Sequence, residues 1–383
     1  MIAKTFLGLE EVLATELVAL GANDVQIQRR AVSFTGDKAL LYRANLYCRT
    51  ASRILVPFLT FKAADADEVY QKVKNVNWGS YLTVDGTFAI DSTIYSDHFK
   101  HSKYVTYRVK DAIVDWFSEK FDKRPTVSVA NPQLMINIHI AQDKCTLSFD
   151  SSGESLHKRG YRVEESEAPI NEALAAGMLL LAGWDGQCNF VDPMCGSGTL
   201  LVEAALIALN IPPGIYRSEF AFEKWNDFDE DLFDTLYNDD SYERNFEYKI
   251  YGSDISPRAI QIAKENVKSA GLTKYIDLKV SPLQKIESAP GKCMLVTNPP
   301  YGERIVSDNI FKLYGDLGSL LKHKFTDCTA WVISSHEQAL KRIGLKPSKK
   351  IKLLNGSLDC LYCRYDIFSG KRTDFLAHKK TSR

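Results

Sequence analysis

The sequence has no long apolar run, no net charge and no cysteine framework, and each absence narrows the possible functions. No apolar run approaches the ~20 residues that a helix needs to cross a bilayer, so we expect no membrane span. The N-terminal segment MIAKTFLGLEEVLATEL carries glutamates where a secretion signal needs an apolar stretch, so we do not expect secretion. The 48 basic and 48 acidic side chains cancel, which argues against a wholly basic nucleic-acid binder.

The eight cysteines are scattered along the chain, as in proteins whose thiols stay reduced in a cytosol, so we expect a cytoplasmic protein. Cys360 and Cys363 form the only Cys-x-x-Cys pair, and no second pair completes a zinc site, so we predict no metal. The length of 383 residues favours roughly two to three globular domains.

Charge is distributed unevenly along the chain. Residues 98–110 carry four basic residues, two histidines and no acid, and residues 341–352 carry six basic residues and no acid. Residues 219–247, by contrast, carry eleven acidic residues against two basic ones. A solvated face explains any single run of this kind. Two acid-free basic segments together favour a polarised surface that suits a phosphate-backbone partner.

The order of the expected elements predicts an α+β N-terminal half and an α/β C-terminal half. Residues 9–20 place leucines and valine on one helical stripe, and residues 23–34 alternate as strands do. Residues 65–150 contain a predicted helix at 103–121 but no nucleophile–base pair and no metal-ligand spacing. From residue 170 onward, short apolar strands alternate with helices, which is typical of a doubly wound parallel sheet.

A strand, a glycine-containing turn and a helix are predicted for FVDPMCGSGTLLVEAAL, residues 190–206. Gly196 and Gly198 allow close approach of a ligand to the backbone, and the helix N-terminus presents unpaired N–H groups. The spacing fits neither a P-loop nor the G-x-G-x-x-G of a dinucleotide site. Asp192, at the strand end, could hold a cationic group such as the amino-acid part of S-adenosylmethionine (SAM). A tight turn without a ligand is the alternative.

Asp254 ends a second strand, in YKIYGSDISPRAI, and precedes a helix. An acid at this position binds a ribose diol in doubly wound nucleotide sites. A helix cap without a ligand is the alternative, because Asp is a common cap. The order of the glycine turn and Asp254 favours a nucleoside-containing cofactor.

The segment NPPYGER, residues 298–304, follows the fourth predicted strand of the C-terminal half. The exocyclic amines of nucleobases have a lone pair delocalised into the ring, so methylation requires acceptors for their N–H protons. Asn298 Oδ1 and the carbonyl of Pro299 are suitable acceptors, and the second proline fixes the direction of that carbonyl. Tyr301 offers a ring for stacking on a flipped base. A rigid strand exit without a ligand is the alternative, and the motif alone does not separate adenine from guanine.

At these residues the chain resembles the THUMP-domain guanine-N2 RNA methyltransferases of the class I SAM-dependent family. The matching segments are SGESLHKRGYR (152–162), DPMCGSGT (192–199), FEKW (222–225) and TNPPYGER (297–304). The chain is most similar to the methyltransferase L half of the bacterial 23S ribosomal RNA enzyme, and the resemblance covers almost the whole chain. It implies a ferredoxin-like lobe over residues 1–62, a THUMP RNA-binding domain over 63–155 and a Rossmann-like methyltransferase domain over 156–383.

The resemblance also implies residue roles. SAM would be held by Pro169, Asn171, Asp192, Pro193, Gly196, Gly198, Thr199, Asp254, Ile255, Leu283 and Asn298. The target guanine would be held by Asn298, Pro299 and Tyr301, and the RNA by Lys100, His101, Lys103 and Arg108. Many relatives place an acid for the adenine amine after the segment LKV, where this chain has Ser281-Pro282-Leu283. Backbone groups near Pro282 would then make that contact.

The resemblance implies a cytoplasmic enzyme that uses SAM to methylate N2 of a guanine in 23S ribosomal RNA. Methylation of a transfer RNA guanine is the nearest alternative. A DNA adenine-N6 methyltransferase would normally carry a DNA target-recognition domain. A non-catalytic RNA-binding assembly factor would have lost the residues that bind the cofactor, yet Asp192, Gly196, Asp254 and Asn298 are all present.

Overall fold

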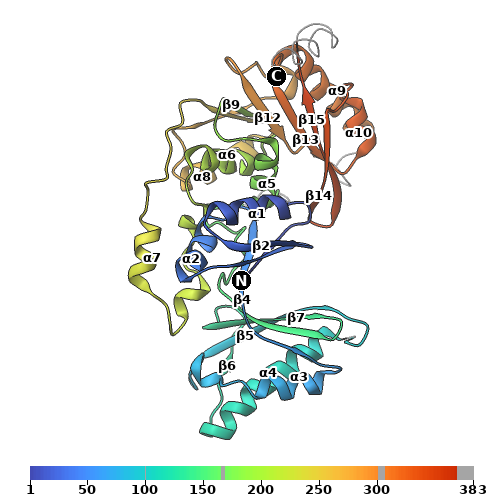
Figure 1. Ribbon diagram of the computed structural model, residues 1–383. Helices are drawn as coiled ribbons and strands as arrows, with labels where there is room; N and C mark the ends of the chain where they lie inside the picture. Colours follow the sequence, from blue (N-terminus) through green and yellow to red (C-terminus); the bar gives the residue numbers. More distant parts are fainter. Residues whose placement is uncertain (100, 165–168, 301–306, 369–383) are drawn as a thin grey trace. The chain divides into compact units, whose positions relative to one another are not determined.

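The computed structural model describes residues 1–99, 101–164, 169–300 and 307–368, and the chain forms two compact units (Figure 1). The first unit contains Met1–Thr5, Leu13–Leu156 and Arg217–Asn238. The second unit contains Phe6–Val12, His157–Tyr216 and Asp239–Arg383. Two residues with roles implied by the sequence, Lys100 and Tyr301, lie outside the described residues.

The first unit contains one eight-stranded sheet with the order β2-β3-β1-β4-β8-β7-β5-β6. Its strands are β1 (Ile2–Thr5), β2 (Asn23–Gln28), β3 (Ala31–Thr35), β4 (Ala51–Lys62), β5 (Thr87–Tyr95), β6 (Thr126–Val127), β7 (Leu134–Ala141) and β8 (Lys144–Asp150). The long strand β4 pairs antiparallel with β1 on one side and with β8 on the other. The ferredoxin-like and THUMP segments therefore share one continuous sheet.

The helices of this part of the chain are α1 (Glu10–Ala19), α2 (Lys38–Tyr47), α3 (Ala66–Lys74) and α4 (Ser102–Phe121). Helix α3 begins where the Asp65 side chain accepts hydrogen bonds from the main-chain N–H groups of Asp67 and Glu68, each at 2.9 Å. Helix α4 buries one stripe of apolar side chains at helical spacing: Val105, Val109, Ala112, Ile113, Trp116 and Phe117. This stripe packs in the core beneath β5 and β7.

Residues Arg217–Asn238, assigned from the sequence to the methyltransferase domain, belong to the first unit. They contain α7 (Glu230–Tyr237) and several aromatic residues. The ring of Phe222, in the FEKW segment, stacks on Tyr42 of α2 with centroids 4.5 Å apart, and Phe233 meets the same tyrosine edge-on at 5.7 Å. The segment is therefore anchored on α2 through aromatic packing.

The second unit contains a seven-stranded sheet with the order β11-β10-β9-β12-β13-β15-β14. Its strands are β9 (Asn189–Asp192), β10 (Ile250–Asp254), β11 (Ile276–Val280), β12 (Cys293–Thr297), β13 (Thr329–Ser334), β14 (Lys349–Asn355) and β15 (Leu358–Asp366). Its helices are α5 (Glu172–Ala182), α6 (Thr199–Leu209), α8 (Pro257–Ser269), α9 (Ser307–Lys324) and α10 (Glu337–Arg342). Strands β9 to β13 are parallel, and β15 is antiparallel to its neighbours β13 and β14. The predicted Rossmann-like fold is confirmed.

The strand order reverses direction beside β9, because the next strands in sequence are added first on one side, as β10 and β11, and then on the other, as β12 and β13. Ligands in open α/β sheets bind outside the carboxyl ends of the strands at such a switch point. The carboxyl ends of β9, β10 and β12 carry Asp192, Asp254 and, just after β12, Asn298. The three sequence motifs therefore meet at one edge of the sheet.

The cysteines differ in part from the expectation of free thiols throughout. Cys293, which begins β12, and Cys328, just before β13, form a disulfide in this structure, so that expectation is wrong for this pair. Cys360 and Cys363 are three positions apart in β15, which places their side chains on opposite faces of the sheet. Among the described helices, none combines the length and apolar character needed to cross a bilayer.

Candidate active site

Asp192 is a buried carboxylate without a cationic partner among the described residues. Its side chain is 1% exposed, and its Oδ1 accepts hydrogen bonds from Thr297 Oγ1 at 2.7 Å and from the Met194 N–H at 3.2 Å. Burial raises the pKa of Asp192 to about 7, and the nearby Asp254 carboxylate adds to this effect. An ionised carboxylate is costly in such a place unless a positive charge joins it. Asp192 is therefore suited to the amino group of a ligand.

The glycine turn between β9 and α6 is held in a conformation that favours glycine. Gly196 has φ +53° and Gly198 has φ +82°, and a Cβ at Gly198 would lie 3.2 Å from the Ala263 Cβ of α8. Gly198 is also the N-cap of α6 and has no side chain with which to cap the helix. The first turn of α6 therefore keeps N–H groups for a ligand.

Asp254 holds the glycine turn from the neighbouring strand. Its Oδ2 accepts a hydrogen bond from the Gly196 N–H at 3.1 Å, and its Oδ1 accepts one from the Ser256 N–H at 2.9 Å. The N-cap of α8 is Ser256, whose Oγ accepts from the Ala259 N–H at 3.2 Å. Asp254 is therefore not the helix cap that the alternative reading required, and its carboxylate lies beside the turn that would receive the cofactor.

Asn298 has a buried acceptor atom that no described residue satisfies. Its Oδ1 has no hydrogen-bond partner, although its neighbour Thr297 bonds to Asp192. Pro299 is buried and Pro300 is exposed, so the chain reaches the surface directly after this point. An unpaired buried acceptor costs about 1–3 kcal/mol and is rare in folded proteins. The oxygen is therefore available to a donor group of a substrate.

Arg162 is a positioning residue that the sequence analysis did not identify. Its Nε donates to Glu172 Oε1 at 2.9 Å, its Nη1 to Ser197 Oγ at 3.2 Å and its Nη2 to Thr199 Oγ1 at 3.0 Å. The Thr199 hydroxyl, expected to contact SAM, thus accepts from this guanidinium. Only the place of Arg162 in the segment HKRGYR could have drawn attention to it, because its partners lie 10 to 37 positions away.

Asn266 of α8 is a second positioning residue missed from the sequence. Its Nδ2 donates to the carbonyl of Ser197 at 3.1 Å, and its Oδ1 accepts from the Val163 N–H at 2.9 Å. The side chain is buried, so both bonds are shielded from water. Together, Arg162 and Asn266 hold the glycine turn in place before any ligand arrives.

Two expected cofactor contacts, Pro169 and Asn171, lie just before α5. Pro169 is half-buried, and Asn171 is the N-cap, whose Oδ1 accepts from the N–H groups of Ala173 at 3.0 Å and Leu174 at 3.2 Å. The Asn171 Oδ1 is therefore engaged by the helix, and any contact with a ligand would fall to its Nδ2.

The remaining expected contacts surround the ends of β9, β10 and β11. Pro193 and Leu283 are buried, whereas the Ile255 side chain, directly after Asp254, is 73% exposed. The Ser281 N–H donates to the carbonyl of Asp254 at 2.9 Å. Ser281 also lines a cavity of about 310 Å³ between β10, β11 and residues 285–290.

The residues expected to bind RNA differ in their surroundings. His101 is the exposed N-cap of α4, and Lys103 is exposed in its first turn. Arg108 is only 23% exposed: its Nη2 lies 2.7 Å from Asp67 Oδ1, and its guanidinium lies 4.2 Å from the centroid of the Tyr70 ring. Arg108 is thus already engaged in holding α4 against α3, and its role in RNA binding stays a prediction.

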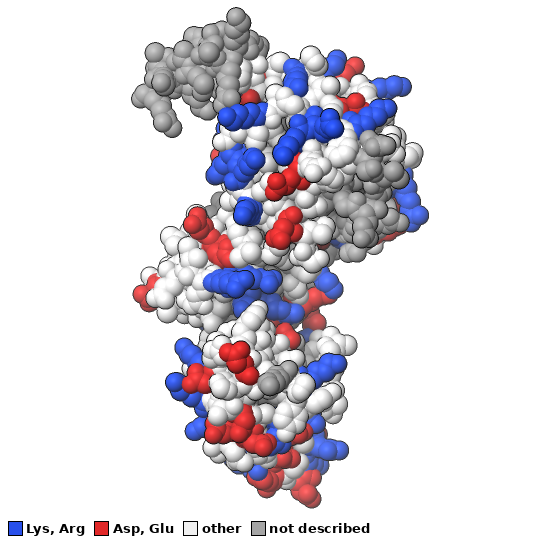
Figure 2. All heavy atoms as spheres, turned by 90° about the vertical axis from the view of Figure 1, so that its right-hand side faces the viewer, with Lys and Arg blue, Asp and Glu red and all other residues white. Residues whose placement is uncertain are grey.

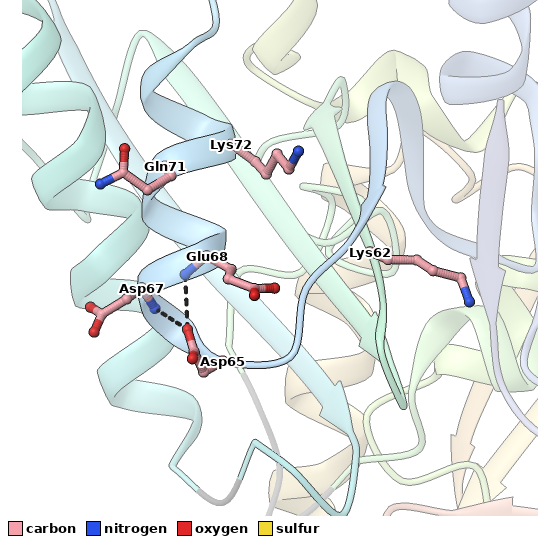
Figure 3. A pocket seen from close by; sticks show the side chains of 6 residues that line it. All are labelled: Lys62, Asp65, Asp67, Glu68, Gln71 and Lys72. Atoms are coloured by element: carbon pink, nitrogen blue, oxygen red, sulfur yellow. Dashed lines mark hydrogen bonds between the residues drawn. The ribbon is translucent and has the colours of Figure 1, made fainter.

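A depression of about 540 Å³ lies beside α3 in the first unit. Figure 3 shows its six lining side chains, Lys62, Asp65, Asp67, Glu68, Gln71 and Lys72. Asp65 caps α3 and Asp67 pairs with Arg108, so its acidic groups have structural partners. The mixed charges and these existing bonds give the depression no evident catalytic use. Of the residues that the structure describes, no three His, Cys, Asp or Glu are grouped to bind a metal.

Comparison with protein families places these observations in a known group. The family model described as the RMKL-like methyltransferase domain matches residues 159–364. The chain belongs to the RMKL-like methyltransferases. A THUMP domain matches residues 63–150, and an RlmL ferredoxin-like domain matches residues 1–55. The resemblance to THUMP-domain class I methyltransferases is therefore confirmed.

Individual relatives agree with this assignment. The chain is 39% identical to a Synechocystis sp. protein provisionally named as an RNA methyltransferase. The match covers 94% of this chain and 95% of that protein. It is 40% identical to the ribosomal RNA large subunit methyltransferase K/L of Syntrophotalea carbinolica, covering 94% of this chain and 52% of that protein. The chain thus spans about half the length of the K/L relative.

Solved structures show the same fold over nearly the whole chain. SMU.472 complexed with S-adenosylhomocysteine (SAH) has a TM-score of 0.86 at 31% identity, and a possible methylase from Clostridium difficile 630 has one of 0.87 at 34% identity. Each match covers 97% of this chain and 98% of the other. The protein is an SAM-dependent methyltransferase, and the unpaired Asp192, the glycine turn and Asp254 fit that cofactor.

Proposed function

We propose that this methyltransferase acts in the cytoplasm on N2 of a guanine in 23S ribosomal RNA. The observation that carries the chemistry is the buried Oδ1 of Asn298 at the switch point of the sheet, which has no hydrogen-bond partner among the described residues. The RNA substrate is supported by the THUMP domain and by relatives named as large subunit ribosomal RNA methyltransferases.

The side chains of this site can localise the lone pair of an exocyclic amine. Asn298 Oδ1 would accept one N–H of the guanine N2 amine, and the main-chain carbonyl of Pro299 would accept the other. With both protons held, the nitrogen lone pair is no longer committed to the ring and can attack. SAM supplies the methyl group as an electrophile on its sulfonium. The methylated amine then loses a proton to solvent, so no strong base is needed.

The cofactor would be oriented by groups already in position. The Asp192 carboxylate would pair with the positively charged amino group, and the Asp254 carboxylate would accept hydrogen bonds from the ribose hydroxyls. Arg162 and Asn266 hold the glycine turn between these two acids. Fixing the donor methyl in this way lowers the entropic part of the barrier.

An exposed group at the N-terminus of α4 supports RNA binding by the first unit. Lys103 lies there with Tyr104 and Tyr107, which are 53% and 58% exposed. Exposed tyrosine rings can stack on unpaired bases, and lysine pairs with phosphates. RNA with unpaired bases in the part that the first unit binds would suit this combination.

The test is to identify the methylated product. The purified protein would be incubated with tritiated SAM and, separately, with unmodified 23S ribosomal RNA transcript, transfer RNA transcript and duplex DNA. We expect labelled N2-methylguanosine in the ribosomal transcript. N2-methylguanosine in transfer RNA alone, or N6-methyladenine in DNA, would contradict the proposal. Calorimetric titration with SAH checks in parallel that the preparation binds cofactor, so a negative result reports on the substrate.

A further inference from the structure

The second unit carries an exposed basic surface that the proposed function has not yet used. We call it the α10–β14 surface and define it by six residues: Lys322, Lys341, Arg342, Lys346, Lys350 and Lys352. All six are exposed, and none is ion-paired in the part of the chain that the structure describes. From residue 337 to residue 355 the sequence contains one acidic residue, Glu337.

The fold gathers these residues from helices α9 and α10, strand β14 and the loop between α10 and β14, which carries Lys346. Lys350 and Lys352 are two positions apart in the edge strand β14, so they point to the same face of the sheet. Helices α9 and α10 pack closely, because a Cβ at Gly318 of α9 would lie 2.1 Å from the carbonyl oxygen of Ile343. This packing places Lys322 Nζ only 2.8 Å from the Cβ position of Gly344, next to Arg342.

The surface is visible as a concentration of basic side chains. Figure 2 presents the side of the second unit that carries α9, α10 and β14, and blue side chains predominate over red ones there. Six cations without paired acids repel one another, which destabilises the folded chain unless an anion binds. The chain has as many acidic as basic residues overall, so this bias is local rather than general.

The surface connects to the catalytic edge of the sheet. The Arg342 guanidinium lies 5.2 Å from the centroid of the Phe311 ring, and Phe311 meets His336 edge-on at 5.5 Å. His336 follows the carboxyl end of β13, whose parallel neighbour β12 ends just before Asn298. Arg342 therefore marks the end of the surface that approaches the edge where the target base would be methylated.

We infer that the α10–β14 surface binds backbone phosphates of the substrate RNA flanking the target nucleotide. The inference rests on the proposed function, since it takes RNA as the substrate. Lysine and arginine neutralise phosphates without reading sequence, and the gain comes from released counterions. The second unit would thus bind the RNA near the reacting base, independently of RNA binding by the THUMP segment.

The test compares two triple variants of the full chain. In the first, Lys346, Lys350 and Lys352 are each replaced by glutamine. In the matched control, Lys264 and Lys268 of α8 and Lys292 before β12, which are exposed in the same unit, are replaced by glutamine. Binding of unmodified 23S ribosomal RNA transcript is measured over a series of NaCl concentrations, and SAH affinity is measured by calorimetry.

For the surface variant we expect RNA affinity about 10- to 100-fold lower at low salt and a salt slope smaller by roughly 2 to 3, because each lost phosphate contact contributes ~0.7–0.9. The KM for RNA should rise, while kcat at saturating RNA and the SAH affinity should match those of the unaltered protein. The control triple should keep the original slope.

Two results would overturn the inference: an unchanged slope in the surface variant, or an equal loss in the control, which would indicate a general charge effect. If the surface variant binds normally and the unaltered protein still methylates the transcript, only this inference fails. If the unaltered protein neither binds nor methylates the transcript, the proposed function fails together with it.

Discussion

Two asparagines, one from each unit, have opposite surroundings. In the first unit, Asn45 donates to Ser151 Oγ at 2.9 Å and accepts from Ser152 Oγ at 2.6 Å, so both ends of its amide are satisfied. In the second unit, the buried Oδ1 of Asn298 has no partner among the described residues. Full satisfaction stabilises a scaffold, whereas an unmet acceptor costs stability and is kept where a ligand supplies the donor.

Two buried aspartates, again one from each unit, show a similar contrast. Asp150 of the first unit is ion-paired with Arg53, while Asp192 of the second unit has only neutral donors, Thr297 and Met194. Burial raises the pKa of both groups, but only Asp192 lacks a charge to offset it. Among the described residues, the second unit therefore holds an amide oxygen without a hydrogen-bond donor and a carboxylate without a cation, which suits both groups to contacts with ligands.

Replacing Asn298 or Asn45 by alanine should give the largest difference between a residue of the active site and a residue that only stabilises the fold. Asn298→Ala should lower kcat by about 100- to 1,000-fold, because an acceptor that acts on the reacting amine is lost. Its SAH affinity should change little, and its free energy of unfolding should not fall, because the change removes an acceptor that has no partner among the described residues. Asn45→Ala should instead cost about 1–3 kcal/mol of unfolding free energy, because its buried hydrogen bonds with Ser151 and Ser152 are lost, with kcat retained. Weakened SAH binding in Asn298→Ala equal to its loss of turnover would contradict the assigned role.

Replacing Asp192 or Asp150 by asparagine would show how the two carboxylates differ in their effect on the pH dependence of stability. The pKa of folded Asp192 is about 7, above the ordinary 3.8, so ionising it costs the folded state. The contribution of Asp192 to the stability of the protein without cofactor should therefore fall as pH rises from about 4 to about 7 and then level off. Asp192→Asn should remove this loss, so above pH 7 the free energy of unfolding of the variant should exceed that of the unaltered protein by about 2–4 kcal/mol. The variant should nevertheless bind SAH at least tenfold more weakly, because the carboxylate is missing.

The control for this prediction is Asp150→Asn. That change leaves the partly buried Arg53 guanidinium without its carboxylate, so the free energy of unfolding should fall rather than rise. Chemical unfolding of both variants at several pH values checks the sign. A stability gain in Asp150→Asn, or none in Asp192→Asn above pH 7, would remove the distinction between the two carboxylates.

The parts of the site that the sequence predicts are those encoded locally. Asp192, Asp254 and Asn298 each end or follow an apolar strand, and strand ends of a parallel sheet lie at one edge, so their convergence follows from order alone. Arg162 and Asn266 were missed because their hydrogen-bond partners are distant in sequence, so that even the matching segment HKRGYR does not reveal which groups Arg162 holds. Chemistry at strand ends is therefore easier to predict than the side chains that hold it in place.

The same reason explains the features of the fold that were not predicted. The FEKW segment lies within the residues that the methyltransferase family model matches, yet it packs with the first unit. Its aromatic side chains pack on Tyr42, some 180 positions earlier in the chain, and no local pattern encodes that contact. The pairing of Cys293 with Cys328 likewise depends on two strand starts becoming neighbours.

The smallest expected effect concerns two basic residues on the same helix, Lys103 and Arg108. Lys103→Glu should lower affinity for the ribosomal transcript about 3- to 10-fold and reduce the salt slope by roughly 1, since an exposed, unpaired cation is lost. Arg108→Gln should leave the slope unchanged and cost about 1 kcal/mol of unfolding free energy, since its guanidinium already pairs with Asp67 and stacks on Tyr70. If Arg108→Gln instead reduces the salt slope of RNA binding as much as Lys103→Glu does, the ion pair between Arg108 and Asp67 must open when RNA binds. Arg108 would then contact RNA as well as hold α4 against α3.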